Sequence, residues 1–368
     1  MTSLSVEQGG LAKGGGRSVV ASAAETLFPG YFALVMATAA VSIASFLLGH
    51  HWIARILLAL NWAFYLALWG LTFVRLVRFP RRLLDDLFDH QRAPGFFTVV
   101  AGTCVLATQT ALVARGTTIA AGLWWLGLGL WFLIMYAFFT AVTVRQQKPT
   151  LARGINGAWL IAAVATQSIV VSRGAVDGLS APAPGIQFLC AAMFMIGSML
   201  YLAIIPLIFY RLTFVRLVSR DFSPPYWINM GAVAITTLAG ATLMMRIGRW
   251  PVLDQLAPFL PGFTLFFWVA STWWIPLLIA LMVWRYVVRR EVPHYEPALW
   301  GMVFPLGMYT TATFQLSRAT GFEFLAPLPK TFIVIAFAAW LIAFIGLVRH
   351  LASSLRVRAP LASQPRPG

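Results

Sequence analysis

The sequence predicts an all-α polytopic membrane protein with ten transmembrane helices, arranged as five helical-hairpin repeats. Its composition is 60% hydrophobic and 10% charged, with a mean hydropathy of +0.80, which excludes a soluble globular protein. The apolar residues form stretches that reach the roughly 20 residues needed to cross a bilayer. A helix-opening motif, in which Pro or Gly precedes an aromatic residue, recurs at steps of 62 to 73 residues. Each step has room for two membrane helices, so the recurrence predicts a repeated hairpin.

The five copies of the motif each open an odd-numbered span. They read PGYF at 29–32, PGFF at 94–97, GAW at 157–159, PYW at 225–227 and PALW at 297–300. The ten predicted spans cover roughly residues 29–48, 54–76, 95–113, 120–143, 155–172, 186–212, 227–245, 261–287, 298–316 and 328–348.

The distribution of basic residues predicts the orientation. Of the 27 Lys and Arg residues, 20 lie in the two tails and the loops after even-numbered spans, and 7 lie in the other loops. Because basic loops stay inside, both termini are predicted to be cytoplasmic in the plasma or inner membrane. The formal charge of +16 is therefore explained by basic residues in the loops that stay inside, and no nucleic-acid partner is expected.

The chain outside the spans predicts two tails. Residues 1–24 are rich in Gly and Ser and are expected to form a flexible cytoplasmic tail, residues 25–350 a transport domain, and residues 351–368 a second tail. Cys104 and Cys190 fall inside apolar spans and are expected to be buried thiols. No metal site and no cofactor are predicted.

Odd and even spans differ in composition. The odd spans are small and hydroxylated, as in ATAAVS at 37–42 and TTLAGAT at 236–242, whereas the even spans carry bulky aromatic pairs such as Trp124-Trp125 and Trp273-Trp274. Small and polar residues suit close helix contacts or a watery path, and bulky ones suit lipid. This predicts an inner ring of five odd helices around a pore inside an outer ring of five even helices. The alternative is that the small residues serve tight packing only.

The ninth span predicts a gate. It holds Phe304-Pro305 between Gly301 and Gly307, and a proline there removes one helical hydrogen bond and pushes Phe304 away from helical geometry. Level with Phe304, the other odd spans carry small or flexible residues, namely Met36, Ala101, Ala163 and Gly231. One phenyl ring facing such residues can close a narrow axis. The alternative is an ordinary packed phenylalanine.

Further polar and small residues are expected to line the same path. These predicted lining residues are Thr38, Gln167, Gly301 and Thr311. No Asp, Glu or His falls in mid-span, where proton-driven transporters and cation channels commonly place one. Such a path favours a weakly held small anion. Arg246 and Arg318, at the outer ends of spans seven and nine, are candidates for attracting it, and the alternative is that both are rim arginines.

One motif leaves an enzyme as a distant alternative. Asp85, Asp86 and Asp89 form a DDxxD sequence in an inside loop, a motif with which membrane prenyltransferases hold diphosphate through magnesium. The competing interpretation pairs Asp85 and Asp86 with Arg81 and Arg82, four residues before them, as solvated ion pairs.

The order of these features resembles the tellurite-resistance/dicarboxylate transporter family over about residues 25–350. The resemblance lies in PGYFALVMAT at 29–38, the five hairpins, and FPLG at 304–307. It implies a five-helix pore closed by a phenylalanine of the ninth helix, here Phe304, often within a homotrimer. This chain departs from the family's pattern of kinked inner helices, because Pro305 is its only mid-span proline in an inner helix.

The resemblance leaves the substrate and the mode of transport open. The family includes anion channels, tellurite-resistance homologues, sulfite efflux pumps and malate permeases, so the expected substrate is an inorganic anion, a sulfite- or tellurite-type oxyanion, or a C4-dicarboxylate. Two hypotheses remain, a gated anion conductor and a coupled exporter of a small anionic metabolite.

Overall fold

The computed structural model describes residues 19–178 and 180–357, and every element in these two ranges is a helix or a helical turn. Nine helices in this part of the chain are long and apolar enough to cross a membrane. They coincide with nine of the ten predicted spans, so the chain is a multi-pass membrane protein.

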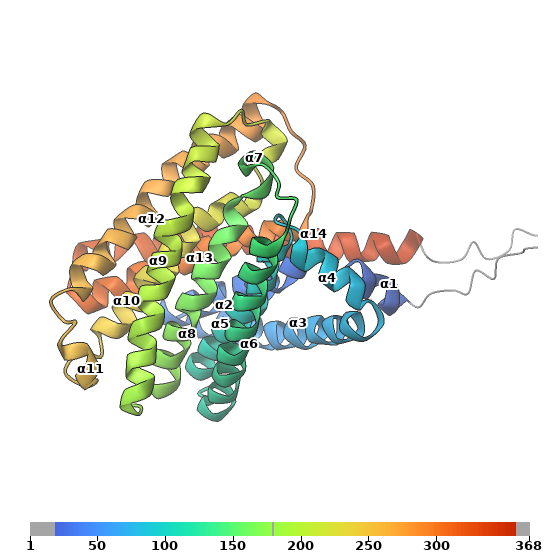
Figure 1. Ribbon diagram of the computed structural model, residues 1–368. Helices are drawn as coiled ribbons and strands as arrows, with labels where there is room; N and C mark the ends of the chain where they lie inside the picture. The colour runs from blue at the N-terminus through green and yellow to red at the C-terminus, as the bar shows by residue number, and fades with distance from the viewer. Residues whose placement is uncertain (1–18, 179, 358–368) are drawn as a thin grey trace, which may run out of the picture.

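The ten main helices alternate along the chain between a shorter set and a longer set (Figure 1). The shorter set is α2 (Ala33–Leu47), α5 (Phe97–Val113), α8 (Ile161–Asp177), α10 (Ile228–Met244) and α13 (Trp300–Thr320). The longer set is α3 (His51–Arg78), α6 (Thr117–Val144), α9 (Pro184–Phe214), α12 (Leu260–Val283) and α14 (Pro327–Val357). Short helices occupy the connections: α1 (Val19–Glu25), α4 (Pro80–Phe88), α7 (Leu151–Gly154) and α11 (Pro251–Asp254).

Helix α13 is not among the nine apolar helices, although it has 21 residues. Its second half is rich in hydroxyl and amide side chains, since Thr310, Thr311, Thr313, Gln315 and Ser317 follow one another closely. The expectation that Pro305 pushes Phe304 away from helical geometry is wrong, because both residues lie within one continuous helix. A helix that lies among other helices can hold a proline, since its neighbours support the backbone.

Burial separates the two sets. In the membrane-crossing segments that end in α2, α5, α8 and α10, 78–94% of the residues in the most apolar window are buried, against 22–44% for the longer set. Most of α13 is buried as well. The shorter helices therefore form the interior, and the longer ones present their side chains outward.

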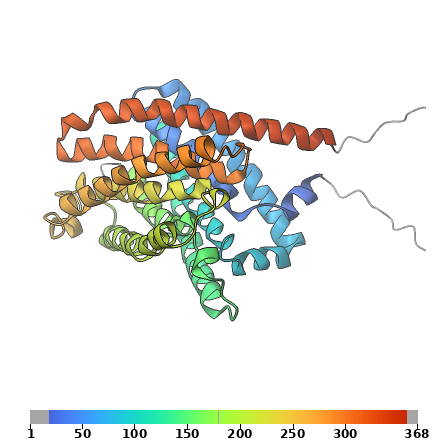
Figure 2. The same ribbon diagram turned by 90° about the horizontal axis from the view of Figure 1, so that it is seen from above.

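Contacts between the interior helices close on themselves. Helix α2 packs against α5, α5 against α8, α8 against α10, α10 against α13, and α13 again against α2. The longer helices pack on the outer sides of the interior helices, as α14 packs along α13 in Figure 2.

Each interior helix begins with a 3-10 turn formed by the opening motif. These turns are η1 (Pro29–Phe32), η2 (Ala93–Phe96), η3 (Gly157–Leu160), η5 (Pro224–Trp227) and η7 (Pro297–Leu299). They contact one another in the same cyclic order as their helices. Their glycines permit this contact: a Cβ on Gly95 would lie 2.6 Å from the amide nitrogen of Gly30, and one on Gly157 would lie 2.2 Å from the carbonyl oxygen of Pro225.

The aromatic pairs of the longer helices divide between lipid and interior. Trp125 and Trp273 are more than half exposed, as predicted, but their neighbours Trp124 and Trp274 are buried. Inward-facing indoles donate hydrogen bonds to interior helices, as Trp124 does to the Ile169 carbonyl at 3.0 Å. The expectation that these aromatics all face lipid is wrong, because an indole N–H needs an acceptor that lipid lacks.

The predicted tails are partly helical. Residues Val19–Glu25 form α1, which packs against α3, and α14 continues to Val357. The prediction of a flexible tail therefore does not hold for residues 19–24. The remainder of both predicted tails, residues 1–18 and 358–368, lies outside the described residues.

Candidate functional site

A cavity of about 100 Å³ lies where the carboxyl ends of the five interior helices meet. All five helices contribute to its wall, and so does the segment just after α10. The apolar part of the lining includes Ile43, Leu47, Leu112, Val171 and Leu238. The polar part consists of Thr108, Thr242, Arg246, Thr311 and Gln315.

Most cavity residues lie on the same helix faces as the residues that the sequence analysis placed level with Phe304. Residues seven apart are about two turns apart on one helix face. Four of the five predicted gate-level residues stand seven positions before a cavity residue: Met36 before Ile43, Ala101 before Thr108, Gly231 before Leu238 and Phe304 before Thr311. On α8, Ala163 stands eleven positions, about three turns, before the cavity residue Gly174.

At the level of Phe304 the interior is filled. Phe304 is 1% exposed, and Met36, Ala101 and Ala163 are also buried. Pro305 packs into the space that Gly231 leaves, since a Cβ on Gly231 would lie 2.7 Å from Cγ of Pro305. These buried residues and the Gly231–Pro305 contact leave the interior closely packed at this level.

Three predicted lining residues face other helices. The Thr38 hydroxyl accepts a hydrogen bond from Trp340 of α14 at 3.0 Å. Gln167 donates to the Phe194 carbonyl of α9 at 3.0 Å, and Gly301 lies closest to Ile228 and Pro225. None of the three is in the cavity wall. Thr38 and Gln167 bond to outer helices, whereas Gly301 lies against the start of the interior helix α10, and their place along a path stays a prediction.

Thr311 does line the cavity, and its hydroxyl donates to the Gly307 carbonyl at 3.1 Å. Thr108, Thr242 and Gln315 also line it, and the sequence reasoning missed all three. The signal that would have found Thr108 and Thr242 is their position seven and eleven residues beyond Ala101 and Gly231. Gln315 Oε1 is buried and has no hydrogen-bond partner among the described residues.

Arg246 is the guanidinium of the cavity. It donates to the Thr242 carbonyl at 2.6 Å and to the carbonyl of Gly174, and its Cζ lies 5.5 Å from the centroid of the Trp250 ring. Its Nε has no partner among the described residues. Burial lowers the pKa of Arg246 from its ordinary value, but an arginine so shifted still carries its charge at neutral pH.

Arg318 lies elsewhere. It is exposed, stacks 5.9 Å from the Phe314 ring, and is not part of the cavity wall. Of the two predicted rim arginines, the structure therefore brings only Arg246 to the cavity.

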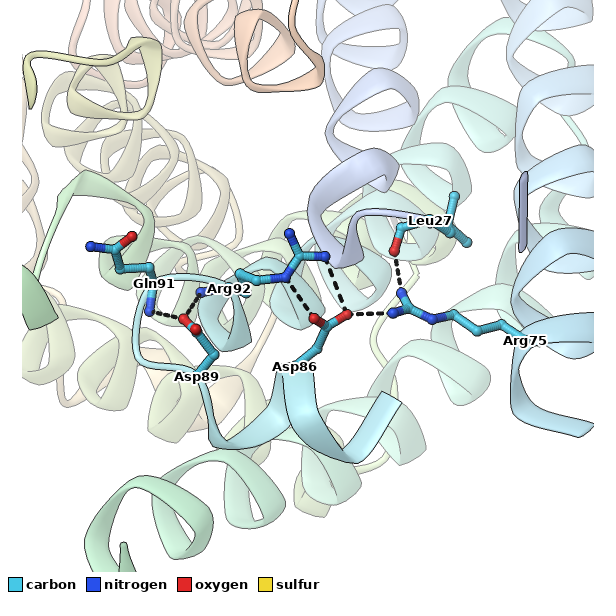
Figure 3. Close-up of polar contacts among 6 residues, drawn as sticks. All are labelled: Leu27, Arg75, Asp86, Asp89, Gln91 and Arg92. Carbon is cyan, nitrogen blue, oxygen red and sulfur yellow. Dashed lines mark hydrogen bonds and ion pairs between the residues drawn. The ribbon is translucent and has the colours of Figure 1, made fainter. Parts of the chain in front are cut away.

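The DDxxD sequence is used in packing (Figure 3). Asp86 is buried and pairs with Arg75 of α3 and with Arg92, at 2.6 Å in each case. Asp89 accepts hydrogen bonds from the backbone N–H groups of Gln91 and Arg92 at 2.8 and 3.0 Å. Asp86 thus joins α3, α4 and the segment that leads into η2.

The predicted pairing of Asp85 and Asp86 with Arg81 and Arg82 is wrong. Asp85 is exposed, and Arg82 approaches Glu25 at 4.0 Å instead. Within the described residues, no group of three or more His, Cys, Asp or Glu side chains is arranged to hold a metal ion.

Comparison with known proteins agrees with this architecture. The profile of the voltage-dependent anion channel family matches residues 26–348. The chain belongs to this family. It is the family that the opening motifs and the FPLG sequence resemble, and its members are channels and transporters of anions, so the chain is an anion transport protein and its class is not enzymatic.

Relatives in other organisms are similar over parts of the chain. A membrane protein of Mycobacterium tuberculosis is 36% identical over 156 residues, which is 42% of this chain and 79% of that protein. A transporter of Methanocaldococcus jannaschii is 27% identical over 43% of this chain and 44% of its own length. A sulfite efflux pump of Arthroderma benhamiae is 25% identical over 57% of this chain and 58% of its own.

Proposed function

We propose that this protein conducts small anions along the axis of α2, α5, α8, α10 and α13, and that Phe304 closes this path. The observation that carries the proposal is the register between the cavity and the level of Phe304. The cavity draws its wall from all five helices, and the same helix faces lead back to Phe304 and its small counterparts. A filled apolar level next to a cavity that carries polar and basic side chains is the arrangement of a hydrophobic gate.

The proposed topology has ten spans, with α13 as the ninth in order and both termini cytoplasmic. Two features support it. Helix α13 touches α2, α10 and α14, so little of it meets lipid and it needs less apolar character than its neighbours. The 20-to-7 division of basic residues supports an orientation in which the 3-10 turns lie inside and the cavity lies toward the outside. The transport domain would then cover residues 25–350, in the plasma or inner membrane.

The lining favours anions over cations. No carboxylate is among the cavity residues, and Arg246 contributes a positive charge. A volume of about 100 Å³ suits a small inorganic anion or a sulfite- or tellurite-type oxyanion, and a C4-dicarboxylate would require the cavity to widen. The named sulfite efflux pump among the relatives is consistent with an oxyanion.

The test is Phe304→Ala in protein reconstituted into liposomes, with anion flux measured per folded molecule. Removal of the ring leaves a void beside small residues that cannot fill it, so flux should rise sharply. Phe304→Leu should give an intermediate flux, since leucine is narrower but still occludes. If Phe304 served packing alone, its replacement by alanine would instead lower the stability by about 3–5 kcal/mol without any gain in flux.

Phe314→Ala is the control for Phe304→Ala. Phe314 stands ten residues further along α13, about 80° around the helix from Phe304, and it is covered by Arg318. Its replacement should leave the path closed. Unchanged flux for a well-folded Phe304→Ala protein would exclude the gate.

A coupled exporter is the second candidate, supported by the relative that is a sulfite efflux pump. The two modes differ in what drives the current. A conductor passes anion current under voltage alone, whereas a coupled exporter needs a proton or other ion gradient.

The family resemblance also implies a homotrimer. The mass of the detergent-solubilised protein would test this oligomeric state.

A further inference from the structure

A second cavity, of about 710 Å³, lies between the end of α12 and the start of α13. It is formed by the π-helical turn η6 (Trp284–Val288), the segment from Arg289 to Glu296, and Ser223 just before η5. It lies beside the 3-10 turns, whereas the axial cavity lies at the other ends of the same helices. The proposed function makes no use of it.

Arg285 is a buried charge in the wall of this cavity. It is 7% exposed, and one of its terminal nitrogens donates to the Phe222 carbonyl. Its Nε has no hydrogen-bond partner among the described residues. A buried guanidinium with an unused donor is costly unless another group supplies an acceptor. It also lies in a π-turn, a geometry often found at functional sites.

Further arginines surround the same space. Arg289 and Arg290 line the cavity and are exposed, and Arg289 lies 5.6 Å from the Trp284 ring, which orients it. The cavity also contains His294 and two carboxylates, Glu291 and Glu296. Glu291 accepts a hydrogen bond from Ser219 at 2.8 Å. Three guanidinium groups against two carboxylates leave the wall net positive.

The apolar surroundings of these arginines indicate the kind of anion. Val287, Val288 and Val292 are 67%, 66% and 80% exposed, next to Arg289 and Arg290 at the end of a helix that crosses the membrane. Exposed valines beside a basic pocket suit a molecule that has an anionic head and apolar chains. Guanidinium groups bind phosphate oxygens in pairs, and basic pockets at helix ends bind anionic lipid headgroups.

We propose that this cavity binds a phosphate group, carried by the headgroup of an anionic phospholipid whose acyl chains lie along the three valines. Arg285 supplies the buried donor at the back of the site, and Arg289 and Arg290 close over the phosphate from outside. The loop that carries them leads directly into η7 and α13, so the bound lipid would restrain the start of the helix that holds Phe304.

The test compares lipid binding to the full chain in neutral detergent, measured by native mass spectrometry with phosphatidylglycerol and with phosphatidylcholine. Arg289→Gln/Arg290→Gln should weaken phosphatidylglycerol binding by roughly fivefold for each arginine removed, and leave phosphatidylcholine binding unchanged. Arg78→Gln/Arg81→Gln is the matched control, since both residues are exposed, lie outside the cavity and change the charge equally. Arg285→Gln should weaken binding further if it folds.

A second arm separates a lipid from a free ligand by titrating inorganic phosphate by calorimetry. If phosphate binding depends on Arg289 and Arg290 but phosphatidylglycerol is not preferred over phosphatidylcholine, the lipid is overturned as the ligand. The cavity would then bind the phosphate group of a soluble molecule. Equal binding of both ligands by the wild type, the Arg289/Arg290 variant and the control would overturn the proposal.

Discussion

Arg246 combines a structural and an electrostatic role at the scale of a single residue. Its guanidinium bonds to carbonyls at the ends of α8 and α10, so it holds two interior helices together. The same group is the cationic part of the axial cavity wall. The sequence analysis named Arg318 together with Arg246 as a candidate for attracting an anion. Arg318 is exposed, stacks on Phe314 and does not line the cavity.

We therefore expect Arg246→Gln to lower anion flux. A charge in a partly desolvated site attracts an anion with an energy of about 1 kcal/mol or more, so flux at low anion concentration should fall by about fivefold or more. Arg246→Lys should retain more flux than Arg246→Gln, because the charge remains. Flux through reconstituted protein, normalised to folded molecules, measures both.

Arg318→Gln serves as the control for Arg246. Its charge is screened by water and salt, so its loss should change flux little. An equal reduction of flux in the Arg246 and Arg318 variants would contradict the assignment of Arg246 to the path.

Helix α13 is held against α2 by a close contact at Gly307. A Cβ on Gly307 would lie 3.0 Å from backbone atoms of Ala40 and Val41. Because backbone atoms cannot move aside as a side chain can, this residue sets the distance between the two helices.

Gly307→Leu should therefore separate α2 from α13 and destabilise the protein. Overpacking of a filled interior typically costs about 1–3 kcal/mol, and the backbone contact places this change toward the upper end. Thermal unfolding in detergent measures the loss. Gly129→Leu on α6 is the control, since a Cβ there meets nothing within 4 Å, and it should unfold like the wild type.

Helix α4 is tied to its neighbours by the buried carboxylate of Asp86. Asp86→Asn removes the charge that Arg75 and Arg92 share, and leaves the nearly buried Arg75 without its counter-ion. Breaking a buried pair in this way costs about 3 kcal/mol or more, which should appear as a lower unfolding temperature. Asp85→Asn should be neutral, because Asp85 is exposed. Equal unfolding temperatures would show that the pair is not needed for stability.

At the scale of the whole molecule, the sidedness of the loops is the prediction to test. Reporter fusions at Arg115 and Gly248 should report an outside location, and fusions at Lys148 and His294 an inside one. The physical reason is the attraction of basic loops to the cytoplasmic side. The controls are the opposite-side reporters at each site, and a reversal at any position would reject the ten-span topology.

The family and the class of fold were predictable because their signals are local. Hydropathy reports each span without reference to its neighbours, and nine of the ten predicted spans coincide with membrane-crossing helices. The opening motif predicted the interior helices for the same reason, since Pro and Gly before an aromatic residue fix the turn that starts each one. The placement of Phe304, Ala101 and Gly231 along one path stays a prediction, although each stands seven residues before a residue of the cavity wall.

The directions of individual side chains were decided only by the tertiary structure. Thr38 and Gln167 have the composition of lining residues, but the rotation of a helix about its own axis depends on its partners, and Trp340 and the Phe194 carbonyl hold these two outward. Asp86 lies four residues after Arg82, yet it pairs with Arg75 and Arg92, because packing of α4 against α3 buries it. Sequence spacing describes one helix at a time, and these contacts join several. The sequence alone therefore determined which segments are apolar enough to cross the membrane, and the packing between them decided which residues line the cavity.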